Sequence, residues 1–128
     1  MKRPSPEDVR IFPAAADFRR WLEEHHATDK ELWVGYYRKS IAKPSVTYAQ
    51  SVEEALCFGW IDGITYRIDD ELYTTRFTPR RRRSNWSAPN VQRVHALLTE
   101  GRMRPAGVAA FDARTARPSM TLPRKAPR

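Results

Sequence analysis

The sequence predicts an α+β fold in which a short antiparallel sheet packs against three to four helices in one small domain. The sheet is expected to consist of a central hairpin over about residues 60–78 plus a strand over about residues 31–38, where aromatic and β-branched residues are concentrated. Helical periodicity of apolar residues is strongest in two segments, 47–59 and 87–101. The resulting order of helix, strand, helix, hairpin, helix and helix is that of a compact α+β domain.

The size of the chain sets its domain organisation. A length of 128 residues fits one domain, and a hydrophobic fraction of 41% is enough to build a core. We expect this domain to cover residues 1–114. Residues 115–128 ("TARPSMTLPRKAPR") contain three prolines and show no periodicity, so they are predicted to form a disordered basic tail.

The first helix is predicted over residues 14–27, and the first strand follows at residues 31–39 ("ELWVGYYRK"), which are rich in aromatic side chains. One face of the helix carries four residues with the spacing i, i+3, i+4 and i+7, namely Phe18, Trp21, Leu22 and His25. This face is expected to pack on the sheet.

The second helix, over residues 47–59, has signals at both ends. Thr47 and Gln50 have the spacing of a capping box, and Gly59 suits the C-terminal stop. Its apolar face is formed by Tyr48, Val52, Ala55, Leu56 and Gly59.

The hairpin is predicted from two strands, residues 60–68 and 72–77. A two-residue turn at Asp69 and Asp70 places most apolar side chains on one face, whereas a three-residue loop would mix the faces. In the predicted register the facing pairs are Ile68 with Glu71, Tyr66 with Tyr73, Ile64 with Thr75, and Asp62 with Phe77.

The third helix is predicted over residues 87–101, with Ser87 as the N-cap, Pro89 in the first turn and Gly101 past the end. Its apolar stripe consists of Val91, Val94, Leu97 and Leu98. A weaker helix is expected over Pro105–Arg114.

Positive charge is concentrated in the second part of the chain. Residues 1–75 hold 10 Lys and Arg against 13 Asp and Glu, a net charge of −3, whereas residues 76–128 hold 13 against 2, a net charge of +11. Such asymmetry is typical of proteins with an anionic partner, such as nucleic acid, a phosphorylated ligand or a membrane surface. A solvated basic face without a partner gives the same pattern.

The segment "RFTPRRRRSNWSAPN" at residues 76–90 is the candidate anion site. A strand should end near Pro79 and a helix should begin at Ser87, so the arginines between them belong to a loop that leads into a helix N-terminus. Arginine forks bind phosphate or carboxylate through two hydrogen bonds. The predicted site consists of Arg80, Arg81, Arg83, Ser84, Trp86, Ser87 and Asn90, with Trp60 as a pocket wall. The other interpretation is that Ser87 only caps the helix and Trp86 only fills the core.

Asp62 is the second residue of interest, because the predicted register places it on the apolar face of its strand beside Trp60 and Phe77. A carboxylate there needs a partner or a raised pKa. The favoured interpretation is an aspartate that accepts hydrogen bonds from the turn backbone beside Gly63, and the alternative is an ion pair with Arg76 or an arginine of the loop. A general-base role for Asp62 would require a substrate cleft.

The sequence lacks the motifs of several classes of functional site. No Cys or His pair has the spacing of zinc ligands, and the sequence contains no P-loop, dinucleotide fingerprint or nucleophile elbow, so neither a metal nor a cofactor is predicted. The single cysteine, Cys57, is interpreted as a small packing residue. Without a signal peptide or an apolar stretch of membrane-spanning length, the expected location is the cytoplasm.

Several motifs together resemble the YdeI/OmpD-associated family, also called the bacteriocin-protection family. The likeness spans about residues 15–112 and is most specific in "ALCFGWIDG" combined with "TPRRRRSNWS". The family's hallmark positions correspond to Trp21, Gly59, Trp60, Asp62, Gly63, Pro79, Arg80, Arg81, Ser84, Trp86, Ser87 and Asn90. The resemblance implies a link to envelope stress but no defined mechanism.

The function expected from these features is that of a small anion-binding domain for a phosphate, a nucleotide-like ligand or a nucleic-acid backbone. One alternative is a metal-free enzyme, with Asp62 as acid or base and the arginines as a substrate clamp. Another is a stress protein that binds an acidic protein or a membrane surface.

Overall fold

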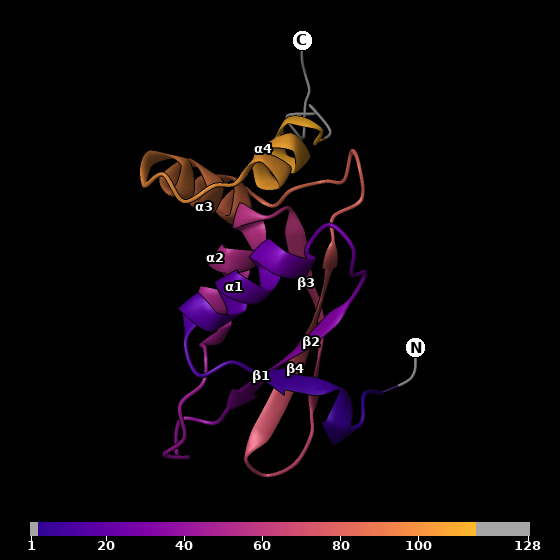
Figure 1. The fold of residues 1–128 in the computed structure, drawn as a ribbon, viewed down its shortest axis with the longest axis vertical. Coiled ribbons are helices and arrows are strands. Elements are labelled where there is room, and N and C mark those ends of the chain that lie inside the picture. Colours follow the sequence, from indigo (N-terminus) through magenta and orange to yellow (C-terminus); the bar gives the residue numbers. More distant parts are fainter. Residues whose placement is uncertain (1–2, 115–128) are drawn as a thin grey trace.

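A four-stranded sheet with helices on one side of it forms the protein, whose computed structural model describes residues 3–114 (Figure 1). The elements in chain order are a short 3-10 helix η1 (Pro6–Asp8), β1 (Val9–Ile11), α1 (Ala15–His25), β2 (Leu32–Tyr37), α2 (Tyr48–Cys57), β3 (Trp60–Arg67), β4 (Leu72–Pro79), α3 (Ala88–Thr99) and α4 (Pro105–Asp112). Helices α1 and α2 lie beside the sheet, and α3 and α4 lie beyond α2 at one end (Figure 1). The predicted α+β class is therefore confirmed. The predicted tail at 115–128 lies outside the described residues.

The sheet contains one strand that the sequence did not indicate. Its strand order is β1-β2-β4-β3, with β1 parallel to β2 and the other neighbours antiparallel. The sheet is thus mixed, whereas only its antiparallel part was predicted. Strand β1 has only three residues, which is too short for an alternating pattern to identify it; its pairing of Val9 with Trp33 depends on tertiary contact.

The helix ends agree closely with the sequence signals. Thr47 and Gln50 form the predicted capping box, and the Ser87 hydroxyl accepts a hydrogen bond from the amide of Asn90 as the N-cap of α3. Gly59 and Gly101 follow α2 and α3 with φ of 78° and 72°, a conformation that favours glycine. Two residues predicted on apolar faces are exposed instead, namely Tyr48 and Leu98.

The hairpin register is correct at its base and wrong at its tip. Asp62 faces Phe77 as predicted, but Thr65 faces Thr75 and Tyr66 faces Thr74, because a bulge lies between Asp62 and Thr65. The facing pairs predicted for Ile64, Tyr66 and Ile68 are therefore wrong.

The hairpin turn explains this shift. Four residues, 68–71, separate β3 from β4, and because the Ile68 amide donates to the Leu72 carbonyl at 2.9 Å, the loop itself consists of Asp69, Asp70 and Glu71. The Asp69 carboxylate accepts hydrogen bonds from the amides of Glu71 and Leu72 at 2.8 and 2.9 Å. A side chain that bonds the turn backbone takes the place of the missing glycine. The bulge offsets the extra turn residue, so the first residues of β3, up to Asp62, keep the predicted pairing with β4.

The core lies between the sheet and the helices and is built around aromatic contacts. Phe18 of α1 contacts Phe12 and Phe77, with ring centroids 5.2 and 5.6 Å apart, and Trp21 contacts Trp60 edge-on at 5.6 Å. The Glu54 carboxylate is buried but paired with two arginines, Arg19 and Arg102, at 2.9 Å each. This network joins α1, α2 and the segment before α4.

The turn after α2 is the point at which three parts of the chain meet. The Cys57 carbonyl accepts a hydrogen bond from the Arg104 amide at 3.0 Å, and the Gly59 carbonyl accepts one from the Arg80 amide at 2.9 Å. Gly107 of α4 packs so closely here that a Cβ atom on it would lie 2.2 Å from the Cys57 carbonyl oxygen. Backbone contacts therefore fix α4 and the start of the loop after β4.

Gly107→Ala should lower the free energy of unfolding by about 2–3 kcal/mol, because the added methyl group would force α4 away from the Cys57 carbonyl. This loss is expected even though alanine is the better helix former. The matched control is Gly63→Ala, whose Cβ would meet only the Arg76 carbonyl oxygen at 3.4 Å. Urea denaturation of both variants measures the difference, and equal stability of the two would contradict the close contact.

Candidate functional site

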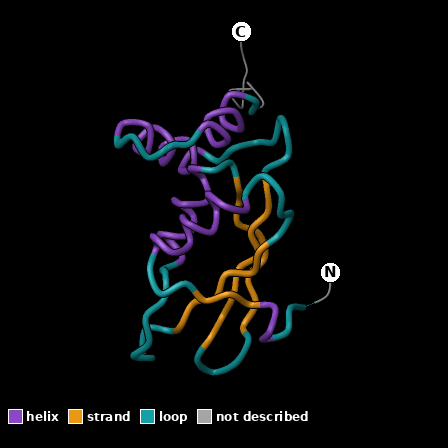
Figure 2. The backbone as a smooth tube through the Cα atoms, viewed as in Figure 1, coloured by secondary structure: helices purple, strands orange, loops and turns teal. Residues whose placement is uncertain are grey.

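The loop between β4 and α3, residues 80–87, holds the four consecutive arginines and connects one end of the sheet to the helices beyond it (Figure 2). Strand β4 ends at Pro79 and α3 begins after Ser87, so both predicted boundaries of this loop are confirmed. The loop contains a turn in which the Ser84 amide donates to the Arg81 carbonyl at 3.2 Å. Within it Arg83 has a φ of 62°, which is uncommon for a residue with a side chain.

Arg80 lies half-buried against Trp86. Its guanidinium carbon is 3.7 Å from the centre of the indole ring, which is a close cation–π stack. The Trp86 ring also contacts Phe111 of α4 at 5.3 Å. Trp86 therefore supports Arg80, and the ring face that Arg80 covers is not open for a base to stack on.

Three polar atoms of the loop are buried without a hydrogen-bond partner in residues 3–114. They are Arg80 Nε, Ser84 Oγ and Trp86 Nε1. Burial also lowers the pKa of Arg80 to about 10, an effect that the nearby charge of Asp62 opposes. Buried unpaired donors are costly and uncommon in folded proteins, and three of them gather in this one loop.

A cavity of about 600 Å³, here named the arginine hollow, opens beside this loop. Its lining residues are Lys30, Ile61, Arg76, Thr78, Pro79, Arg80, Arg81 and Ser84. Arg76 is paired with Glu31, whereas Lys30, Arg80 and Arg81 form no ion pair with a carboxylate in the described part of the chain. The hollow thus gathers unneutralised positive charge beside unpaired donors.

The structure divides the predicted site between two cavities. Arg80, Arg81 and Ser84 line the arginine hollow, but Ser87 and Asn90 line a second cavity of about 320 Å³, here named the aspartate cleft. Its lining residues are Tyr48, Ala49, Val52, Asp62, Ser87, Pro89, Asn90 and Arg93. Arg83 lines neither cavity. Adjacent residues of a strand point to opposite faces, and Ile61 faces the hollow while Asp62 faces the cleft.

Trp60 lies in the core and not at the wall of either cavity. It is 1% exposed, it contacts Trp21 edge-on, and its indole N–H donates to the His26 carbonyl at 3.3 Å. The role of pocket wall that the sequence suggested for Trp60 does not fit this position. The "GWIDG" motif instead places a tryptophan in the core two residues before an aspartate in a cleft.

Asp62 has a partner that the sequence did not indicate, since the Tyr48 hydroxyl donates a hydrogen bond to its carboxylate. Arg76, one of the partners considered from the sequence, is paired with Glu31 instead. Burial, followed by this bond to Asp62, raises the pKa of Tyr48 to about 12. Tyr48 and Arg93 lie in separate helices and become neighbours only in the fold, so no local sequence signal identifies them as site residues.

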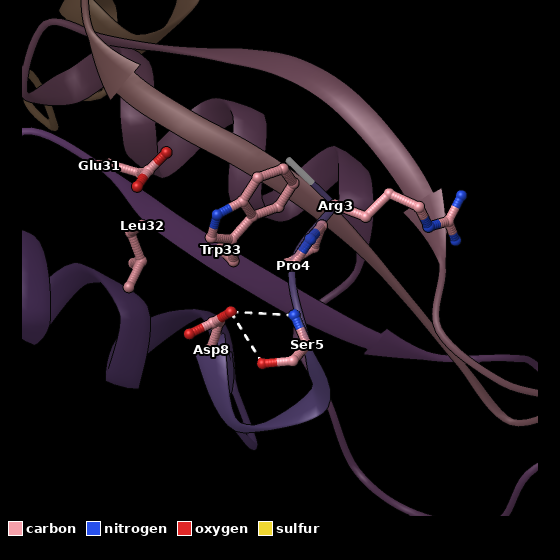
Figure 3. Close-up of a pocket in the computed structure, with 7 residues that line it drawn as sticks. All are labelled: Arg3, Pro4, Ser5, Asp8, Glu31, Leu32 and Trp33. Carbon is pink, nitrogen blue, oxygen red and sulfur yellow. Dashed lines mark hydrogen bonds between the residues drawn. The ribbon is translucent and has the colours of Figure 1, made fainter. Parts of the chain in front are cut away.

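A third cavity of about 510 Å³ lies between the N-terminal segment and β2 (Figure 3). Arg3 extends away from the other lining residues (Figure 3). It donates to the Arg67 carbonyl at 2.7 Å and lies over the Tyr66 ring. Ser5 and Asp8 bond each other. The polar groups here are mixed in charge and already engaged, which distinguishes this cavity from the arginine hollow.

The comparisons with known proteins identify the family. The family model described as a domain of unknown function, DUF8412, matches residues 10–110. The chain belongs to the DUF8412 family. The match does not support membership of the YdeI/OmpD-associated, or bacteriocin-protection, family, which stays a resemblance of motifs. No curated protein and no solved structure matches the chain.

Two further findings concern residues 3–114 of this DUF8412 domain. None of the helices in this range is long and apolar enough to cross a membrane. The same residues contain no cluster of three or more His, Cys, Asp or Glu side chains that could hold a metal ion.

Arg80→Met should leave the free energy of unfolding at pH 7 unchanged or raise it by up to about 1 kcal/mol. It keeps an unbranched side chain on Trp86 and removes a half-buried charge that pairs with no carboxylate in residues 3–114, which offsets the loss of the cation–π stack and of the long, 3.5 Å bond to the Asn85 carbonyl. Folding lowers the pKa of Arg80 to about 10, so the free-energy cost of burying its protonated guanidinium is fully present at neutral pH and decreases as the pH rises above 10. Any advantage of the variant should fade in that range. Urea denaturation in a chloride buffer tests this, and a loss above about 2 kcal/mol would show a structural ion pair instead.

Tyr48→Phe should lower the free energy of unfolding at pH 7 by about 1 kcal/mol, the low end for a hydrogen bond to a charged group because Tyr48 is 42% exposed. The raised folded-state pKa of about 12 means that this contribution is complete below pH 10 and is lost as the pH rises toward 12. Denaturant titrations at pH 7 and 11 measure it. Tyr37→Phe, which removes a hydroxyl without a hydrogen bond in residues 3–114, is the control; an equal effect of both variants would contradict the Tyr48–Asp62 bond.

Proposed function

We propose that the protein binds a phosphate-bearing ligand in the arginine hollow. The observation that carries this proposal is the pair of buried donors without partners, Arg80 Nε and Ser84 Oγ, whose side chains line the same hollow as Lys30 and Arg81. An anion with several acceptor oxygens would satisfy both donors and offset the unneutralised charge at once. The fold holds Arg80 in place through Trp86, so little ordering is needed when the ligand binds.

The lining of the hollow favours recognition of phosphate over recognition of a base. Its only apolar residues are Ile61 and Pro79, and Arg80 already covers the Trp86 ring. Four cations, one of them paired with Glu31, favour a ligand with two or more negative charges. A volume of about 600 Å³ falls within the usual range for small-molecule sites, which suits a phosphorylated metabolite or one nucleotide unit of a longer chain.

The alternative functions are less well supported by this geometry. An enzyme with Asp62 as acid or base and the arginines as clamp needs both in one cavity, but Asp62 and the arginines line different ones. Binding of an acidic protein or a membrane surface remains a second use of the same positive charge. The motif resemblance to the YdeI/OmpD-associated family supplies no ligand for any of these functions.

Inorganic phosphate should raise the melting temperature of the wild-type protein, and the rise should continue with the logarithm of the phosphate concentration above the Kd, because phosphate binds the native state alone. Arg81→Ala should weaken phosphate binding at least about tenfold, since one charge-assisted hydrogen bond is worth about 1.5–3 kcal/mol. Arg82→Ala is the matched control: it removes the same charge from the next residue, which does not line the hollow. Thermal denaturation and calorimetric titration at constant ionic strength measure both variants.

Equal weakening in the two variants would mean that phosphate only screens the arginine run, and would overturn the proposed site. Titration with labelled DNA at several salt concentrations then distinguishes the ligand source. If the ligand is a nucleic-acid backbone, the logarithm of the DNA association constant should fall with the logarithm of the salt concentration, with a slope of roughly −0.9 per phosphate neutralised on duplex DNA. If the ligand is a phosphorylated metabolite, the metabolite should bind more tightly than DNA at physiological salt.

A further inference from the structure

We propose that the aspartate cleft binds a small zwitterion, a molecule that carries an ammonium and a carboxylate group, between Asp62 and Arg93. This is a second site, separate from the arginine hollow. Ile61 and Asp62 are neighbours on β3 but line different cavities, so a ligand in one does not occupy the other. The proposal therefore does not depend on the phosphate site.

The observation behind it is a pair of opposite charges that share a cleft without pairing. Asp62 and Arg93 both line the cavity of about 320 Å³, yet they form no salt bridge with each other. Each is held by an uncharged partner instead: Tyr48 donates to Asp62, and Arg93 donates to the side-chain oxygen of Asn90 at 2.7 Å. Opposite charges held apart by neutral partners leave a gap that a ligand with both charges can bridge.

The hydrogen-bonding groups that stay free in the cleft are divided in the same way as its charges: an acceptor lies on the Asp62 side and donors lie on the Arg93 side. On the β3 side, Asp62 uses one oxygen for the Tyr48 hydroxyl and keeps the other as an acceptor. On the α3 side, Arg93 and Asn90 keep N–H donors, and the Ser87 hydroxyl, which accepts from the Asn90 amide, keeps its own proton to donate. An ammonium group fits the acceptor side and a carboxylate fits the donor side.

Ligands of a single charge suit the cleft less well. A simple anion held by Arg93 would lie in the same small cavity as the Asp62 carboxylate, and a simple cation held by Asp62 would meet the Arg93 guanidinium. In a zwitterion each repulsion is replaced by an attraction. The volume is at the lower end for ligand sites and suits a molecule of the size of an amino acid.

The test is a calorimetric or NMR titration of the full chain with unbranched amino acids of increasing length, from the α-amino to the ε-amino acid. Each is compared with the alkylamine and the alkyl carboxylate of the same length. We expect saturable binding that is strongest at one chain length, which matches the gap between Asp62 and Arg93. The single-charge analogues should bind at least tenfold more weakly.

Two substitutions locate the site. Asp62→Asn and Arg93→Gln should each weaken zwitterion binding at least tenfold, and because Arg93 is exposed on α3, its variant decides the result if the Asp62 variant does not fold. Arg81→Ala, which is chosen to impair phosphate binding, should leave zwitterion binding unchanged. The absence of saturable binding at every chain length, or binding that survives Arg93→Gln, overturns the proposal.

Discussion

The turn after α2, residues 57–59, is the constraint on which the rest of the structure depends. Two of its carbonyl groups, on Cys57 and Gly59, accept hydrogen bonds from the amides of Arg104 and Arg80, which lie far away in the sequence. Gly59 has a φ of 78°, and a Cβ atom on it would lie 2.9 Å from the Ala106 carbonyl oxygen. Because both conformation and space require glycine here, this turn sets the end of α2, the start of β3 and the position of α4.

The position of the candidate anion site follows from that turn through a chain of contacts. Docking of α4 brings Phe111 against Trp86, and Trp86 carries the Arg80 guanidinium. The backbone of Arg80 is fixed at the other end by the Gly59 carbonyl. A charged group on a surface loop is thereby held by core elements, which is the arrangement expected when a binding group must be positioned before its ligand arrives.

Local signals predicted most of the fold, and tertiary contacts account for what they missed. The caps at Thr47 and Ser87 depend on side chains within three residues, so spacing alone identified them. Strand β1 and the bulge before Thr65 depend on pairing with distant strands, which no local pattern encodes. The sequence predicted a single candidate site because its residues are close along the chain. Its division into two cavities arises from the alternation of side chains on β3 and from Tyr48 of α2, which the sequence did not link to Asp62.

The charge state of Arg80 decides how this loop is to be understood. Burial lowers its pKa to about 10, but that value is still well above neutral pH, so the guanidinium stays protonated in the folded protein. The protein therefore does not relieve the cost of burial by losing the proton, as a buried lysine often does. The charge of Asp62 lies near enough to stabilise the protonated form, yet it is engaged by Tyr48 in the other cavity and leaves Arg80 Nε without an acceptor. An anion in the arginine hollow would supply both the countercharge and the missing acceptor, which neither Asp62 nor any other carboxylate in residues 3–114 provides.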